Sequence, residues 1–206
     1  ELDVAAWRII YTAEGGVLAL ALYALWPTWS GMEVRPALAG LLERHAGYVT
    51  ALLAAWRDPR SIDLHRLAAI RGEARLTRSN AEAIVERMLA EPAARHAIPA
   101  PAALGLLAAI RRHSLAALAL HAGLERSMPA AVPGVEALAR GLASSLAILA
   151  GALRSGTPPA PLPPLRDAHL ALGTADTLLY DETDLMVDSV NTMAALLAGQ
   201  PGAAHA

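Results

Sequence analysis

The sequence predicts an all-α fold, with one terminal transmembrane helix followed by an antiparallel bundle of about five long amphipathic helices. Hydrophobic residues make up 55% of the 206 positions, and alanine and leucine, which favour helix, are prominent among them. The chain contains no Phe and no long segment of alternating polar and apolar residues, so strand signals are scarce. Prolines instead divide the chain into long segments in which apolar residues recur at helical spacing.

The first segment, Val4 to Trp26, predicts a helix that crosses a membrane. At about 1.5 Å per residue it is long enough to span a hydrocarbon core of about 30 Å. Pro27 ends the helix because its ring cannot fit into a further turn. Trp26 and Trp29 flank this proline, and tryptophan is typical of the headgroup level of a bilayer. Residues 1–29 are therefore predicted to form the last transmembrane helix and its interface.

A buried core helix or an interfacial segment is the alternative for this region, because the uninterrupted apolar run from Gly15 to Leu25 is short. If the helix spans a membrane, its polar residues are expected to face a protein interior or a water-filled path. Arg8, Thr12 and Glu14 are then the candidates for a substrate pathway. Small residues predict close packing against other membrane helices. On this segment they are Gly15, Gly16 and Ala19.

Residues 30–198 are predicted to form a cytoplasmic helical bundle. Its first helix begins at Ser30, a favourable N-cap with Glu33 three residues later, and ends at Asp58-Pro59. A second helix runs from about Ile62 and stops before Pro92. Apolar positions at 3-4 spacing predict the buried face of each helix. They are Leu38, Leu41, His45, Tyr48, Leu52 and Trp56 on the first, and Leu67, Ile70, Ala74, Thr77, Ala81, Ile84 and Met88 on the second.

Three more helices complete the predicted bundle, over about 102–127, from Val135 through Leu153, and over about 166–198. Residues 157–164 form a Pro-rich linker, which is too rich in proline to be helical. Residues 199–206 are expected to be a disordered tail. Short connections make successive helices neighbours, which predicts antiparallel packing. The positions expected to face inward are Leu107, Ile110, Leu118 and Leu124, then Leu138, Leu142, Leu146 and Leu149, then Leu172, Leu179, Met186, Val190, Met193 and Leu197.

The second helix of the bundle also has a polar band beside its apolar stripe. Arg71, Arg75, Arg78 and Glu82 recur at helical spacing, and Asn80 lies among them. The spacing of Arg78 with Glu82, and of Arg87 with Glu91, predicts ion pairs within the helix. A solvated face is the simplest interpretation of this band. Contact with lipid headgroups, with another domain or with an anionic ligand is the alternative.

Composition and motifs exclude several classes of function. A formal net charge of −2 gives no general basic surface, so nucleic acid is not an expected partner. The chain has no Cys, which excludes disulfides and thiolate catalysis, and no motif of a hydrolase, a nucleotide-binding loop or a zinc protease occurs. Asp181, Asp184 and Asp188 could gather a cation, but no second acidic cluster accompanies them. His113 and His121 are expected to be core or surface residues. We therefore predict a non-enzyme without metal or cofactor.

Two blocks of the sequence resemble the fusaric acid resistance (FUSC) family of inner-membrane proteins. The first block, within residues 1–29, comprises Arg8-x-x-x-Thr12-x-x-Gly15 and Leu25-Trp26-Pro27-x-Trp29. The second, within 64–92, comprises Arg71-x-x-x-Arg75-x-x-x-Ser79-Asn80-Ala81-Glu82-Ala83 and Arg87-Met88-Leu89-Ala90-Glu91-Pro92. The match is to the end of the second membrane bundle of the family and to its C-terminal cytoplasmic domain.

The resemblance implies the C-terminal part of a bacterial inner-membrane efflux transporter for aromatic carboxylic acids or related small toxic compounds. Its expected partners are the lipid bilayer, the remaining membrane helices of the full-length protein, further copies in a homo-oligomer and a small anionic aromatic substrate. Residues 30–206 would be cytoplasmic and would serve assembly or gating. The alternative is a soluble all-helical interaction or scaffold module without transport activity. Apolar spans upstream of Glu1 are expected only for the transporter.

Overall fold

The computed structural model describes residues 2–25, 30–126, 130–132 and 134–199, and every regular element in these ranges is helical. The all-α prediction is therefore confirmed. The elements are α1 (Leu2–Leu25), α2 (Ser30–Arg57), the 3-10 turn η1 (Pro59–Ser61), α3 (Leu64–Leu89), the 3-10 turn η2 (Ala93–Arg95), α4 (Ala100–Arg126), α5 (Val135–Ser155), α6 (Leu165–Leu170) and α7 (Thr177–Ala198).

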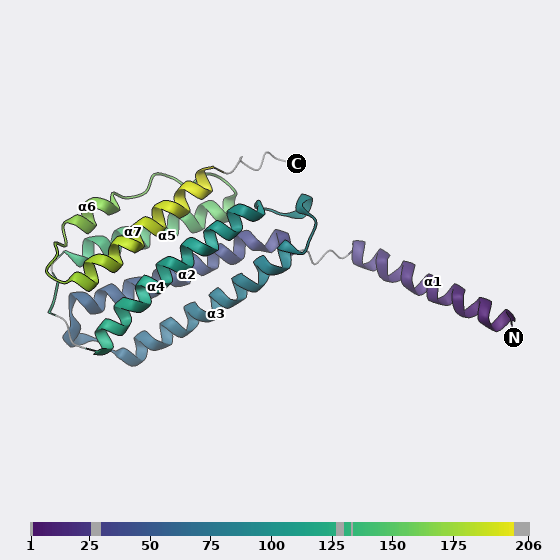
Figure 1. Ribbon diagram of the computed structural model, residues 1–206, viewed down its shortest axis with the longest axis horizontal. Coiled ribbons are helices and arrows are strands. Elements are labelled where there is room, and N and C mark those ends of the chain that lie inside the picture. Colours follow the sequence, from purple (N-terminus) through teal and green to yellow (C-terminus); the bar gives the residue numbers. More distant parts are fainter. Residues whose placement is uncertain (1, 26–29, 127–129, 133, 200–206) are drawn as a thin grey trace.

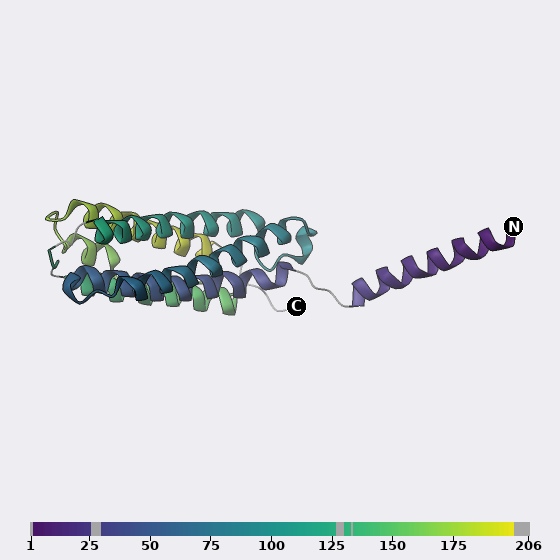
Figure 2. The ribbon, with the colours of Figure 1, turned by 90° about the horizontal axis from the view of Figure 1, so that it is seen from below.

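Helices α2 to α7 form a bundle, and α1 stands apart from it in both views (Figures 1 and 2). The central helix α2 packs against α3 and α5, while α4 packs against α7. Two ion pairs show that α2 and α5 are antiparallel. Arg57 Nη1 lies 3.4 Å from Glu136 Oε2, and Arg154 Nη2 donates to Glu43 Oε2 at 2.6 Å. The short helix α6 lies beside the first half of α7.

Glycines on α4 allow α7 to approach closely. A Cβ at Gly123 would lie 2.6 Å from Leu178 Cδ2, and one at Gly105 would lie 3.1 Å from Leu196 Cδ1. Because Gly105 meets the end of α7 and Gly123 meets its beginning, α4 and α7 are antiparallel. Helices α2 and α4 run in the same direction, because His45 and Tyr48 contact His113 and His121 in that order. Helix α7 therefore runs in the same direction as α5, and the Pro-rich segment between Ser155 and α6 returns along the bundle (Figure 1).

Leucine, alanine and methionine fill the core, as the 3-4 stripes predict. Each of the six positions expected inward on α2 is at most 3% exposed, including His45, Tyr48 and Trp56. One expected core residue is wrong, because Leu118 on α4 is 43% exposed. It lies at the edge of an opening between α3 and α4, where no apolar side chain covers it completely. The apolar stripe predicted which face of α4 is directed inward, but it did not predict the opening between α4 and α3.

The last predicted helix, 166–198, is also corrected, because it is two helices. Gly173 adopts φ +66°, which lies in the left-handed region that favours glycine and ends a helical path. Asp176 then caps α7 by accepting the Leu179 N–H at 2.9 Å. The short helix α6 can consequently fold back and place His169 against α7. The remaining boundaries agree with the predictions, although most of the expected tail, 200–206, lies outside the described residues.

Candidate functional site

Helix α1 presents an unusual amount of apolar surface. Every side chain that the structure describes between Trp7 and Leu22 is exposed, and the exposed fraction reaches 67% for Val17 and 70% for Leu20. The rings of Trp7 and Tyr11 stack with their centroids 5.8 Å apart. A continuous exposed apolar surface of this kind is typical of a segment that is covered by lipid or by another protein.

The predicted pathway residues lie on this exposed helix. The Thr12 hydroxyl donates to the Arg8 carbonyl oxygen at 2.8 Å, so Thr12 is satisfied within α1. Glu14 and Ala19 are exposed. No atom lies within 4 Å of a Cβ placed on Gly15 or Gly16, so within the described residues no helix packs on this predicted small-residue face. The predicted interface anchors Trp26, Pro27 and Trp29 lie outside the described residues.

Among the described residues, the two helices that are long and apolar enough to cross a membrane are α4 and α5. About half of each is buried in the bundle, at 44% and 50% of the apolar window, and core helices of soluble proteins meet the same criterion. Helix α1 contributes the shorter apolar stretch Ile10–Leu22. Membrane association therefore has weak support from length and composition, and the helix with the exposed apolar surface is α1.

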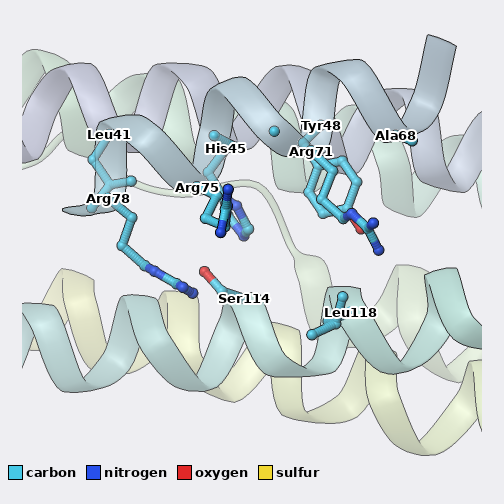
Figure 3. A pocket seen from close by; sticks show the side chains of 11 residues that line it. Leu41, His45, Tyr48, Ala68, Arg71, Arg75, Arg78, Ser114 and Leu118 are labelled. Atoms are coloured by element: carbon cyan, nitrogen blue, oxygen red, sulfur yellow. The ribbon is translucent and has the colours of Figure 1, made fainter. Parts of the chain in front are cut away.

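A second feature is a pocket of about 430 Å³ between α2, α3 and α4 (Figure 3). Its walls combine arginines from α3 with polar and apolar groups from α2 and α4. Figure 3 shows the three arginine side chains extending from α3 into the space in front of α4, with Arg78 directed toward Ser114. The lining residues are Leu41, His45, Tyr48, Ala68, Arg71, Gly72, Ala74, Arg75, Arg78, Ser114 and Leu118.

The positive charge of this pocket is poorly neutralised. Arg78 Nε lies 3.9 Å from Glu82 Oε1, which confirms the predicted pair, but Arg111 Nη2 lies at the same distance from that oxygen. Among the residues that the structure describes, no carboxylate lies within 4.0 Å of the guanidinium of Arg71 or Arg75. One carboxylate is thus shared by two arginines, and Arg71 and Arg75 have no carboxylate within 4.0 Å in the described part of the chain.

The other residues of the predicted polar band do not line the pocket. Asn80 and Arg87 are exposed. Glu91 Oε2 accepts the Gly31 N–H at 2.9 Å and so joins the end of α3 to the start of α2. The band therefore separates into a pocket-lining part, formed by the three arginines, and a structural part near the end of α3.

Two hydrogen-bonded pairs form the inner wall of the pocket and the core behind it. His45 Nε2 lies 2.8 Å from His113 Nδ1. The Tyr48 hydroxyl lies 3.0 Å from His121 Nδ1, and His121 Nε2 lies 3.1 Å from Glu125 Oε1. A carboxylate can only accept, so we assign the His121 proton to Nε2, and Tyr48 donates to Nδ1.

Burial keeps these groups uncharged. Burial lowers the pKa of His45 to about 4, and the nearby charge of Arg78 acts in the same direction. Burial is also the main cause that lowers the pKa of His113, and repulsion from His45 is the second cause. The pKa of Tyr48 is raised well above its usual range by burial. At neutral pH the histidines and the tyrosine are therefore neutral, and the arginines supply the charge of the pocket.

Sequence reasoning placed the three arginines on one band but did not find the groups that face them. His45 and Tyr48 were identified only as core positions, and Ser114 was not identified. The available signal was the presence of polar residues on the otherwise apolar stripe of α2. Such a signal does not reveal the hydrogen-bond partners of His45 and Tyr48, because these partners, His113 and His121, belong to α4 and are distant in the sequence.

Two of the three aspartates that could gather a cation, Asp184 and Asp188, are used within the fold, and the third, Asp181, is exposed. Arg166 on α6 makes short ion pairs with Asp184 and Asp188. His169 Nδ1 lies 3.1 Å from the Thr183 hydroxyl in the same region. Within the described ranges no group of His, Asp and Glu is arranged to hold a metal ion. Asp184 and Asp188 thus serve to hold α6 against α7.

Comparisons with known proteins identify no relative: no family model matches the chain, and no curated protein or solved structure is significantly similar to it.

Proposed function

We propose that this chain is the C-terminal part of a bacterial inner-membrane efflux transporter of the FUSC type, which exports aromatic carboxylic acids or related small toxic compounds. In this proposal α1 is the last transmembrane helix, and the bundle is a cytoplasmic domain that serves assembly or gating. The main supporting observation is the exposed apolar surface of α1 beside a bundle that has a complete core of its own.

The dimensions and surface of α1 fit this role. The helix has 24 residues, which corresponds to a length of about 36 Å, and its apolar stretch Ile10–Leu22 would cover about 20 Å of a hydrocarbon core of about 30 Å. Removing a large apolar side chain from water contributes about 1.5–3 kcal/mol, so cover over Val17, Leu18, Leu20 and Leu22 is strongly favourable. Lipid and neighbouring membrane helices would provide that cover in the full-length transporter.

The bundle has the features of a domain in water. The apolar faces of α4 and α5 are packed against α7 and α2. Their outer faces contain exposed arginines, among them Arg112 and Arg140. A charged side chain facing lipid is costly, so these helices are better suited to a solvated bundle than to a bilayer.

A soluble interaction module is the second candidate, and the same exposed surface supports it. The apolar face of α1 could bind a groove on a partner protein. This candidate requires that residues 1–206 be monodisperse in buffer without detergent. The transporter requires further apolar spans upstream of Glu1 in the full-length sequence.

Replacing Arg8 tests the transport proposal. We expect Arg8→Ala in the full-length protein to reduce export of an aromatic carboxylate about tenfold or more, because a charge-assisted contact in a desolvated path contributes about 1.5–3 kcal/mol. Export is measured in cells at matched membrane levels of the protein. Arg112→Ala, on the bundle surface, is the matched control and should export normally. Unchanged export by Arg8→Ala would remove Arg8 from the pathway.

A further inference from the structure

We propose that the pocket between α3 and α4 is a binding site for a small organic anion, namely a carboxylate attached to a compact apolar body. Arg71 and Arg75 would hold the carboxylate, and Arg78 would contribute charge from the next turn. The proposal concerns the bundle alone and does not depend on whether α1 crosses a membrane or whether the protein transports anything.

Charge is the first argument for an anion. Three arginines line one pocket, and among the described residues the carboxylate that lies within 4.0 Å of one of them is Glu82, which is 3.9 Å from Arg78 and is shared with Arg111. Glu125 lies behind the wall, where it is hydrogen-bonded to His121. A planar guanidinium can donate two parallel hydrogen bonds to a carboxylate. Arg71 and Arg75 lie one helical turn apart, so both can reach the same group.

The inner wall of the pocket carries no charge that would compete with a bound anion. His45 is 3% exposed and Tyr48 is also 3% exposed, and both are neutral because burial lowers the pKa of the first and raises that of the second. Neither competes with a bound anion as a carboxylate would. The wall also has a lower dielectric constant than water, which strengthens the attraction between guanidinium groups and an anion.

The remaining walls fit an apolar body. Leu41 and Ala74 from the bundle core, Ala68 from α3 and Leu118 from α4 provide carbon surface on opposite sides of the pocket. The exposed fraction of 43% for Leu118 would fall if such a body lay against it. The volume of about 430 Å³ is in the usual range for small-molecule sites, about 300–1,000 Å³.

A bound ligand would connect two helices that are only weakly joined at this point. The arginines belong to α3, whereas Ser114 and Leu118 belong to α4, and the ion pair between Arg111 and Glu82 measures 3.9 Å. A molecule that contacts both helices would stabilise their present separation, because binding to the folded state alone stabilises it. Ligand occupancy could thereby control the position of α3 relative to α4.

The test uses the full chain in a mild detergent, which keeps it in solution whether or not α1 enters a membrane, and 4-fluorobenzoate as the probe, followed by fluorine NMR and calorimetry. The neutral 4-fluorobenzamide reports on apolar contact alone, and inorganic phosphate reports on charge alone. Arg71→Gln with Arg75→Gln removes the predicted ligands. Gly72→Leu fills the pocket without removing charge, since no atom lies within 4 Å of a Cβ at Gly72. Arg112→Gln, which does not line the pocket, is the matched control, and circular dichroism confirms the fold of each variant.

We expect saturable binding of 4-fluorobenzoate to the parent chain and to Arg112→Gln. The double arginine variant and Gly72→Leu should each bind at least about tenfold more weakly, which corresponds to about 1.4 kcal/mol. Equal binding of 4-fluorobenzoate by all folded variants would overturn the site. So would binding of 4-fluorobenzamide as tightly as 4-fluorobenzoate, or phosphate binding that displaces the probe with higher affinity, because either result removes the requirement for an organic carboxylate.

Discussion

At the scale of single residues, the bundle contains polar groups that depend on one another. His45 and His113 are 3% and 0% exposed, and their ring nitrogens lie 2.8 Å apart. A pair of neutral imidazoles can share one proton in a hydrogen bond, whereas two imidazolium ions would repel each other without water to screen them. The pair is therefore compatible with the fold only while it stays largely uncharged.

Acid is expected to destabilise the bundle through these histidines. The pKa of His45 is about 4 in the folded chain and near 6.5 when the ring is exposed, so the unfolded chain binds more protons between these values. The contribution of neutral His45 to the free energy of unfolding is fully present above about pH 6.5 and is lost as the pH falls toward 4. His45 contributes on the order of 3 kcal/mol to this loss.

Urea unfolding between pH 4 and 7 measures this effect. The double variant His45→Leu with His113→Leu should show a smaller dependence of the free energy of unfolding on pH. Glu86→Gln is a suitable control, because Glu86 is an exposed carboxylate on α3 and its replacement leaves the histidine pair in place. An unchanged pH dependence in the histidine variant would show that the pair titrates freely in the folded chain.

At the scale of elements, the contact between α4 and α7 depends on glycine. Gly123 lies against both α7 and α2, since a Cβ there would be 2.6 Å from Leu178 Cδ2 and 3.3 Å from Trp56 Cζ2. Gly47 on α2 is also helical, but no atom lies within 4 Å of its would-be Cβ. The two positions therefore separate the effect of helix propensity from the effect of close packing.

We expect Gly123→Val to lower the free energy of unfolding by about 1–3 kcal/mol, because the added methyl groups force α7 and Trp56 to move. Gly47→Ala should raise it by about 0.5–1 kcal/mol, because alanine favours helix and has room. Chemical denaturation of both variants measures the difference. If Gly123→Val left the free energy of unfolding unchanged, α4 and α7 would not approach each other this closely.

Helix positions could be predicted from the sequence because local signals determine them. Pro59 and Pro92 limit α2 and α3, and periodic leucines identify the buried faces. The break between α6 and α7 was missed, although Gly173 and Asp176 provide a turn residue and a helix cap. In the pocket, the arginines were predictable from their spacing on α3. Their neighbours from α2 and α4 were not, because tertiary packing brings these residues together.

At the scale of the whole molecule, the structure separates one exposed apolar helix from a packed bundle (Figures 1 and 2). Leu18 on α1 and Leu76 on α3 illustrate the difference between them. Their exposed fractions are nearly equal, 62% and 63%, but Leu18 is surrounded by other exposed apolar residues whereas Leu76 lies between arginines and a threonine. Our proposal assigns the first to lipid and the second to water.

Thiol labelling distinguishes the two environments directly, because the chain contains no cysteine of its own. Leu18→Cys and Leu76→Cys, each in the otherwise unchanged chain, are reconstituted into liposomes and treated with a water-soluble maleimide, and the same reaction in denaturant gives the full extent of labelling. We expect Leu76→Cys to react readily and Leu18→Cys to react at least about tenfold more slowly, since a thiol in hydrocarbon does not form the reactive thiolate. Equal rates at the two positions, with the chain recovered in the aqueous fraction, would contradict the assignment of α1 to the membrane.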